Sequence, residues 1–252
     1  MKVVIEQQKL KDILDYLQVS SLFPFPNITI KKGEMISIQE TSDHAVFRYV
    51  KFTKEYFKTL SDKEENIKID ADKLHKIISR EEPTSVLTIT TKDGRLIVEG
   101  KRSFAKLNLV DTDVGAKDKL PFDIKKGVPY FKGNVPLDTY VSMGLKSFKS
   151  VVEYAKVLDT EFFKYEVTKD REFSIKVGDL EGYAETVEYN PNAQIRDFGG
   201  PVNVVLAKGV KELADTFTGN VGIRMRTAYP AWFFEASHKH RFGVLIAPHS
   251  GE

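Results

Sequence analysis

Two pairs of polar residues have the spacing of a chemical site. His238 and His240 would point the same way from a strand, where two imidazoles can bind a transition metal. The chain has no cysteine to complete that site, and the charged segment 238–241 is also typical of a solvated hairpin tip. Asp111 and Asp113 share a side in the same way and would suit Mg²⁺ binding or acid–base catalysis. We favour the solvated tip and a structural role for the aspartates, and expect no metal or cofactor.

The common catalytic motifs are absent from the sequence. It has no Walker loop, no Rossmann glycine fingerprint, no His-Glu-x-x-His and no Gly-x-Ser-x-Gly. Three consecutive aromatic residues, Trp232, Phe233 and Phe234, have rings that would stack on bases, but their place in a terminal strand favours packing in the core. We therefore expect a protein that is not an enzyme.

Basic residues recur at helical spacing on four segments, each opposite an apolar stripe. The net charge of +2, from 38 basic and 36 acidic residues, indicates no partner by itself. Acidic residues dilute the pattern, and a solvated helix face rich in lysine is an alternative interpretation. The basic residues that would contact an anion are Lys9, Lys11, Lys73, Lys76, Arg80, Lys146, Lys149, Lys156, Lys208 and Lys211.

Apolar periodicity predicts four helices and sixteen strands around these residues. The helices are expected at 8–19, 72–80, 145–158 and 208–217, and a polar loop at 190–200. Strands are expected at 2–5, 27–31, 35–40, 45–52, 66–70, 85–90, 95–99, 103–109, 139–143, 161–168, 172–178, 182–189, 202–206, 221–227, 231–237 and 241–246.

The order of these elements occurs twice, as β-α-βββ-β-α-βββ, which indicates an internal repeat. The segment 115–133 has three glycines, two prolines and no period, so it reads as a linker. We predict an α+β protein with a first repeat at 1–114, a connecting loop at 115–133 and a second repeat at 134–252.

Length and composition are those of an ordinary globular protein. The 252 residues are 41% hydrophobic and 29% charged, enough to build a sizeable core. The absence of cysteine excludes disulfides and thiolate metal sites and favours a reducing compartment. The sequence shows no signal-peptide pattern and no run of eighteen apolar residues, so we expect a cytosolic location.

Simple geometry relates the four basic helices to a duplex. Helices about 8–10 Å apart and about 10 Å thick, twelve to a circle, leave a bore of roughly 21–28 Å. Eight helices from a dimer leave a hole that is too small for a duplex roughly 20 Å wide. A ring of three chains would therefore admit DNA.

Several segments, in their order along the chain, resemble the proliferating-cell-nuclear-antigen (PCNA) type of DNA sliding clamp. Segment 105–114 is similar to the end of the family's first repeat, and Leu120-Pro121 to its connecting loop. Segments 35–39 and 42–44 fit the loop before the fourth strand. Tyr229-Pro230, Phe234-Glu235 and 244–248, Val-Leu-Ile-Ala-Pro, are similar to the closing strands and tail.

The resemblance implies the DNA-clamp fold, with two helices on antiparallel sheets in each repeat, and a homotrimeric ring that acts as a polymerase processivity factor. It implies duplex DNA, bound without sequence preference, as a partner. It also implies a clamp loader, and polymerase, nuclease and ligase bound through short aromatic peptides. The location would be cytoplasmic, at the nucleoid, or nuclear in a eukaryote. A monomeric DNA-binding processivity protein, one subunit of a heterotrimer and an enzyme that uses the histidine pair remain alternatives.

The resemblance also assigns two contact sites. Subunits would pair strand 104–109 with strand 182–189, and Glu185 and Glu188 would face Lys106. The interface residues would be Phe104, Lys106, Leu107, Leu109, Tyr183, Glu185 and Val187. The partner peptide would bind His44, Leu120, Pro121, Pro230, Ile246, Ala247 and Pro248. To these we add Phe122 and Ile124, because exposed apolar residues in a linker often mark a docking site, although Phe122 would equally hold its loop against the sheet.

Overall fold

The computed structural model describes residues 1–20, 22–110, 122–125, 128–131, 133–178, 185–236 and 242–249. The chain divides into two compact units. Unit 1 is Met1–Gln39 with Tyr49–Lys119, and unit 2 is Glu40–Arg48 with Leu120–Glu252. The division after Lys119 lies inside the expected linker. The segment Glu40–Arg48 belongs to unit 2, although it lies within the first repeat along the chain.

Unit 1 has two helices and two antiparallel sheets. The helices are α1 (Gln7–Gln18) and α2 (Ala71–Ile78), with a short 3₁₀ turn at Lys54–Tyr56. One sheet has the order β5-β1-β7-β8-β9, and β4, β3, β2 and β6 follow one another in the other, with residues 46–48 of β4 belonging to unit 2. The strands are β1 (Lys2–Glu6), β2 (Asn27–Lys31), β3 (Glu34–Glu40), β4 (Val46–Thr53), β5 (Thr59–Leu60), β6 (Glu65–Lys68), β7 (Val86–Lys92), β8 (Arg95–Glu99) and β9 (Phe104–Asn108).

Unit 2 repeats this arrangement. Its helices are α3 (Leu145–Val157) and α4 (Val210–Thr216), and its sheets have the orders β17-β13-β19-β20-β21 and β16-β15-β14-β18. A small sheet, β10-β11-β12, precedes them. The strands are β10 (Asp123–Lys125), β11 (Val128–Phe131), β12 (Val135–Pro136), β13 (Thr139–Met143), β14 (Phe163–Val167), β15 (Phe173–Gly178), β16 (Thr186–Tyr189), β17 (Ala193–Asp197), β18 (Val202–Leu206), β19 (Val221–Met225), β20 (Ala231–Glu235) and β21 (Phe242–Ile246).

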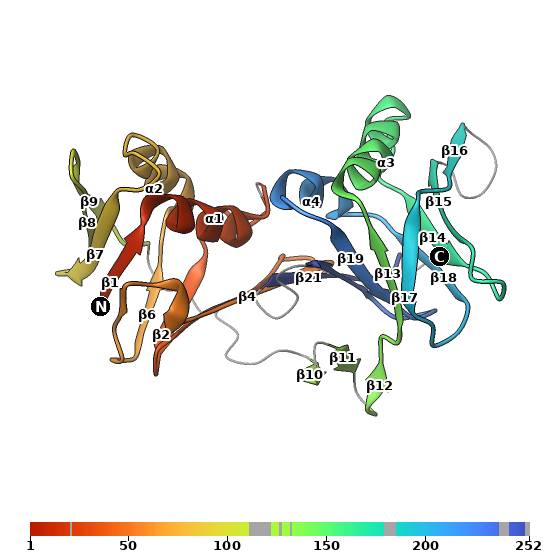
Figure 1. Ribbon diagram of the computed structural model, residues 1–252, viewed down its shortest axis with the longest axis horizontal. Coiled ribbons are helices and arrows are strands. Elements are labelled where there is room, and N and C mark those ends of the chain that lie inside the picture. The colour runs from red at the N-terminus through yellow and green to blue at the C-terminus, as the bar shows by residue number, and fades with distance from the viewer. Residues whose placement is uncertain are drawn as a thin grey trace. The chain divides into compact units, whose positions relative to one another are not determined.

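The two helices of each unit lie side by side on the same side of its strands (Figure 1). In α1, Leu10, Ile13, Leu14 and Leu17 are buried, so the apolar stripe faces the strands as its spacing predicts. In α3, the buried residues Phe148, Val151, Val152 and Ala155 form the equivalent stripe. The polar side chains of these helices therefore point away from the sheets.

Four sequence expectations were wrong in detail. The second helix ends at Ile78, so Arg80 lies in the turn after it, and α4 begins at Val210, so Lys208 precedes it. The expected polar loop 190–200 contains β17, because Ala193–Asp197 pairs with β13 across a register shift. The expected linker contains β10 and β11, which pair antiparallel. About half of the predicted strand ends differ from the observed ones by one or two residues, and nearly all the others agree.

The carboxyl-terminal strands of unit 2 form its core. All five residues of β20 are buried, which confirms the predicted core packing of Trp232, Phe233 and Phe234. Phe233 contacts the ring of Phe148 from α3, and Trp232 contacts the ring of Phe122 on the opposite face. This strand is covered on both faces, which is why its first four residues are all apolar.

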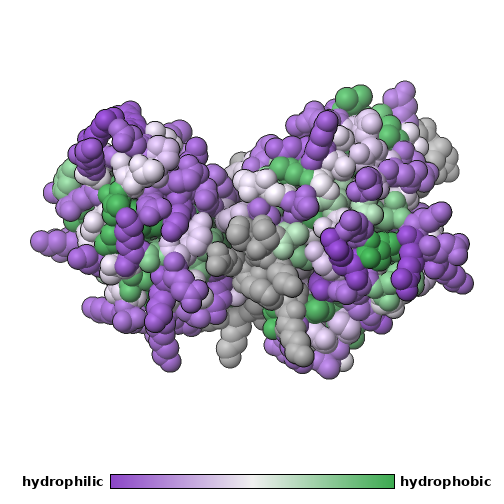
Figure 2. Space-filling model, viewed as in Figure 1, coloured by the Kyte–Doolittle hydropathy of each residue, from purple (hydrophilic) through white to green (hydrophobic). Residues whose placement is uncertain are grey.

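The surface visible in Figure 2 is mostly hydrophilic in each unit, and small hydrophobic areas lie among the hydrophilic ones. No helix in the described ranges is long and apolar enough to cross a membrane. The same ranges hold no group of three His, Asp or Glu side chains placed to bind a metal ion. His238, His240, Asp111 and Asp113 lie outside the described residues.

Candidate nucleic-acid interface and partner site

The exposed face of α3 carries the clearest basic stripe in unit 2. Lys146, Lys149 and Lys156 are all exposed on the side opposite the apolar stripe. In unit 1, Lys73, Lys76 and Arg80 are exposed, whereas Lys9 and Lys11 on α1 are half-buried. Lys211 on α4 is also half-buried and Lys208 is exposed. Each unit therefore carries basic side chains on the same side of its strands as its helices.

Half of the ten predicted bases form ion pairs with acids of the same unit. Short-range pairs join Lys9 to Glu6 at 3.9 Å, Lys73 to Asp70 at 2.9 Å, Lys76 to Asp72 at 2.5 Å and Lys156 to Glu153 at 2.7 Å, and Lys208 pairs with the distant Asp43. The hydrogen bonds that Lys76 and Lys156 donate to Asp72 and Glu153 raise the pKa values of these two lysines. These acids dilute the positive charge of the helix faces.

The other five bases have no ion pair with any residue that the structure describes. They are Lys11, Arg80, Lys146, Lys149 and Lys211. Of these, Lys146 and Lys149 lie one turn apart on one exposed helix face. Because their charge is not neutralised by a neighbouring acid, they are the strongest candidates for contact with an anion in unit 2.

A second site forms where residues 41–45 meet the carboxyl-terminal tail in unit 2. The Ala247 amide donates to the Ala45 carbonyl at 2.8 Å, and the His249 amide donates to the Val205 carbonyl at 2.8 Å. Leu206 and Pro248 form an isolated bridge. The structure thus brings together the loop that carries His44 and the tail residues Ala247 and Pro248, all three predicted for the partner site.

Within the loop, His44 is strongly exposed and has a positive φ of 58°. Its Nδ1 lies 3.0 Å from the Glu40 carboxylate. The loop is closed by its own backbone, since the Thr41 amide donates to the Val46 carbonyl at 2.9 Å and the His44 amide donates to the Thr41 carbonyl at 2.9 Å. These bonds present the imidazole to solvent.

The remaining residues predicted for the partner site differ in accessibility. Ile124 and Pro230 are half-buried, whereas Ile246 is 1% exposed and lies in the core. Phe122 is only 5% exposed, and its ring lies against Phe47, Phe131 and Trp232. The expectation that Phe122 is exposed is therefore wrong, because three aromatic rings bury it and it holds its segment against the sheet. Leu120 and Pro121 lie outside the described residues.

The strands predicted for the subunit interface are both sheet edges. Strand β9 is the last strand of β5-β1-β7-β8-β9, and β16 is the first of β16-β15-β14-β18. Phe104 at the start of β9 is 62% exposed. Lys106 and Glu185 are also exposed, Leu107, Leu109 and Val187 are half-buried, and Tyr183 lies outside the described residues.

Solved structures of PCNA have the same fold as this chain. No family model matches the sequence, and a search of curated proteins found no match. A PCNA of Entamoeba histolytica superposes with a TM-score of 0.79 at 14% identity, covering 99% of this chain and 98% of that one. A. fulgidus PCNA bound to the C-terminal region of FEN-1 gives 0.77 at 16%, covering 100% and 99%. Thermococcus kodakaraensis PCNA gives 0.75 at 14%, covering 98% and 99%. The chain has the sliding-clamp fold.

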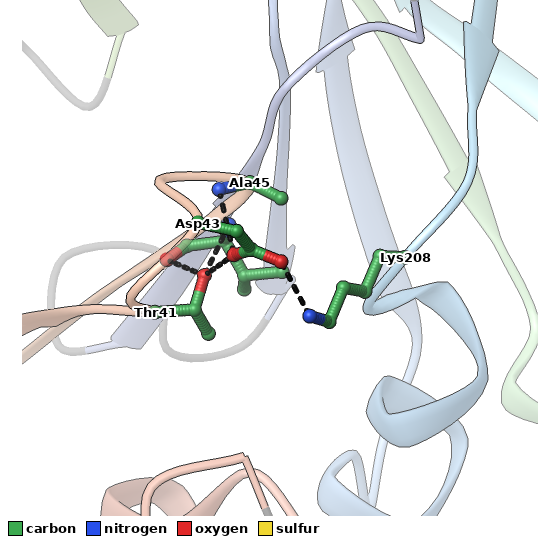
Figure 3. Close-up of polar contacts among 5 residues, drawn as sticks. Thr41, Asp43, Ala45 and Lys208 are labelled. Atoms are coloured by element: carbon green, nitrogen blue, oxygen red, sulfur yellow. Dashed lines mark hydrogen bonds and ion pairs between the residues drawn. The ribbon is translucent and has the colours of Figure 1, made fainter.

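The clamp fold brings in residues that the sequence patterns did not single out. Asp43 lies in a segment used above only for its similarity, yet its carboxylate joins Thr41, Ala45 and Lys208 (Figure 3). A Thr-x-Asp sequence followed by a strand is a turn signal, and it points to the internal hydrogen bonds. Nothing local pointed to Lys208, which is 165 residues away.

Proposed function

We propose that this chain is a sliding clamp that encircles duplex DNA and acts as a processivity factor, tethering DNA polymerase and other replication or repair enzymes. It would act as a scaffold and not as a catalyst, wherever the cell keeps its DNA, in the cytoplasm, at the nucleoid or in a nucleus. The observation that carries the proposal is the repeated strand order, which leaves β9 at a sheet edge in unit 1 and β16 at a sheet edge in unit 2.

Because the chain is a repeat, the two edge strands β9 and β16 correspond to two strands, β21 and β4, that pair with each other within the chain. Strand β21 ends the second repeat as β9 ends the first, and β16 is the third strand after α3 as β4 is the third after α1. In the chain, β21 is hydrogen-bonded to β4. A β9 edge therefore has its natural partner in the β16 edge of another copy, which would pair as β21 pairs with β4.

Pairing between copies would also satisfy exposed groups. A free edge strand leaves backbone donors and acceptors unpaired and invites uncontrolled association. Phe104 would become less exposed, and Lys106 would approach Glu185 and Glu188, which are exposed beside or on β16. Each chain carries both β9 and β16, so the contacts between copies would be head-to-tail, and we propose that three copies close into a homotrimeric ring.

Duplex DNA would lie against the helix side of each unit. Lysine contacts to phosphates are independent of sequence and are weakened by salt, so they allow sliding while the closed ring prevents loss. The unpaired Lys146 and Lys149 would contribute most in unit 2. The five paired bases would contribute less, because their acids already compensate their charge.

The loop–tail site in unit 2 would bind partner proteins. Polymerase, clamp loader, nuclease and ligase would each insert a short peptide with aromatic anchors near His44, Pro230, Ala247 and Pro248. The C-terminal region of FEN-1 bound to A. fulgidus PCNA supports this by analogy of fold. Phe122 and Ile246 would support the site from beneath, since both are buried.

Mass and shape test the ring. Sedimentation equilibrium of the purified chain should give three times 28.6 kDa, and particle images should show a closed annulus. A monomer at every concentration would refute the ring and favour a monomeric DNA-binding processivity protein. A chain that forms rings only with two different clamp subunits would show that it is part of a heterotrimer.

A further inference from the structure

One predicted DNA contact, Lys208, differs from the other nine in its ion pair. It lies in the turn between β18 and α4, and its side chain is paired with Asp43 and not with an acid of its own segment. The other four paired bases all have acids three or four residues away. Lys208 is therefore the one basic residue of the set whose ion pair joins two distant segments of unit 2.

The Asp43 carboxylate is held at both oxygens (Figure 3). Its Oδ1 accepts from the Thr41 hydroxyl at 2.6 Å and from the Ala45 amide at 3.2 Å, and its Oδ2 accepts from Lys208 Nζ. The Thr41 hydroxyl in turn accepts from the Val46 amide at 3.1 Å. Lys208 thus forms an ion pair with a carboxylate that also accepts hydrogen bonds from within the loop.

The electrostatics agree with this geometry. Hydrogen bonds from Lys208, from Thr41 and from the Ala45 amide hold the pKa of Asp43 well below its usual range, and the bond to Asp43 raises the pKa of Lys208. Both groups are therefore charged at neutral pH. The pair persists above pH 3.8, the ordinary Asp value, and is lost as the pH falls toward the lowered pKa of Asp43.

The loop is anchored from two sides by this arrangement. On one side the Ala45 carbonyl accepts from the Ala247 amide of the tail, and on the other Lys208 holds Asp43. His44 lies between these two anchors. Its exposed side chain depends for its position on a short backbone segment with a positive φ.

We propose that Lys208 is a positioning residue for the partner site, holding residues 41–45 against the tail, and that it is not a phosphate contact. That the loop serves partners rests on the proposed function. The coupling of Lys208 to the loop does not, because every contact involved lies within unit 2 of a single chain.

A double-mutant cycle tests the coupling. Asp43→Asn removes the ion pair but keeps a side-chain oxygen for Thr41 and Ala45, and Lys208→Met removes it from the other side. Hydrogen–deuterium exchange of residues 41–46 should rise about threefold in either variant, as for loss of an exposed ion pair, and no further in the double variant. Lys211→Met, on the adjacent helix, is the matched control and should leave this exchange unchanged.

A second measurement separates the loop from DNA. For a random-sequence duplex oligonucleotide, the slope of log affinity against log NaCl concentration should fall by about 1 in Lys149→Met and stay unchanged in Lys208→Met. Unchanged loop exchange in Lys208→Met, additive effects of the two substitutions, or an equal loss of salt dependence in Lys208→Met would each overturn the proposal. If the wild type shows no salt-dependent duplex binding, the DNA function fails, while the exchange cycle still decides the role of Lys208.

Discussion

At the residue scale, Tyr165 is a polar group in an apolar place. Its side chain is fully buried on β14, between the rings of Phe173 and Phe233. Among the residues that the structure describes, none hydrogen-bonds its hydroxyl, and burial raises the pKa of the phenol. The ring contributes to the core, whereas the hydroxyl lies in an apolar environment with no hydrogen-bond partner among the described residues.

Tyr165→Phe should therefore raise the free energy of unfolding by about 1 kcal/mol, because it removes an unsatisfied buried hydroxyl and keeps the ring. Urea denaturation at pH 7 measures the change. Tyr165→Ala, which leaves a cavity, should instead cost about 3–5 kcal/mol. A lower midpoint for Tyr165→Phe would mean that the hydroxyl has a stabilising partner.

At the element scale, α2 is short and depends on its amino-terminal cap. Asp70 accepts from the Lys73 amide at 2.9 Å, as is typical of an aspartate immediately before the first turn of a helix. Burial acts to raise the pKa of Asp70, but hydrogen bonds from the Lys73 amide and side chain outweigh it, and the pKa is lowered. The cap is therefore charged at neutral pH and strengthens the start of the helix.

Asp70→Ala should cost about 1 kcal/mol of stability at pH 7. Because the folded pKa of Asp70 is lowered, the difference from wild type should shrink as the pH falls below 3.8. Urea denaturation at several pH values checks both statements. Asp70→Asn keeps an acceptor at the cap and should cost less, so an equal cost for the two variants would contradict the capping role.

At the scale of the whole molecule, two kinds of surface determine what the protein does. Edge strands β9 and β16 would join copies of the chain, and the helix sides of the units would face the duplex. Of the predicted bases in unit 2, Lys146 and Lys149 are the exposed ones without an ion pair to a described residue, and they lie on the face of α3 turned away from its sheet. The ring would hold DNA by closure, with these lysines supplying a weak and salt-sensitive attraction.

Lys146→Glu with Lys149→Glu should leave the oligomeric state intact but impair clamp-stimulated DNA synthesis. In duplex binding, the slope of log affinity against log salt should fall by about 2 per chain, because each substitution removes one lysine–phosphate interaction. Lys164→Glu with Lys176→Glu is the matched control. It makes the same change of charge at two neighbouring lysines, which lie opposite each other on strands β14 and β15 and not on α3. Unaltered synthesis in the α3 variant would show that this face does not contact DNA.

Local patterns in the sequence predicted much of the fold. The stripes of α1 and α3, the alternation of β1 and β14 and the Asp70 cap all follow from interactions within a few residues. The order of elements therefore showed the repeat, and the positions opposite each stripe identified the outward lysines. The aromatic strand 231–235 was correctly placed in the core because nothing polar interrupts it until Glu235.

Contacts between distant segments needed the tertiary structure. The sequence of β17 is polar and has no strand pattern, and the strand forms because it pairs with β13. Phe122 is buried by rings from three separate segments. Periodicity placed Lys208 on the basic face of a helix, but in the folded chain it precedes α4 and meets Asp43 across 165 residues. Periodicity reports which side of an element is apolar. Which strands remain edges, and which lysines are already neutralised, depends on chain topology, and so those features were decided by the fold alone.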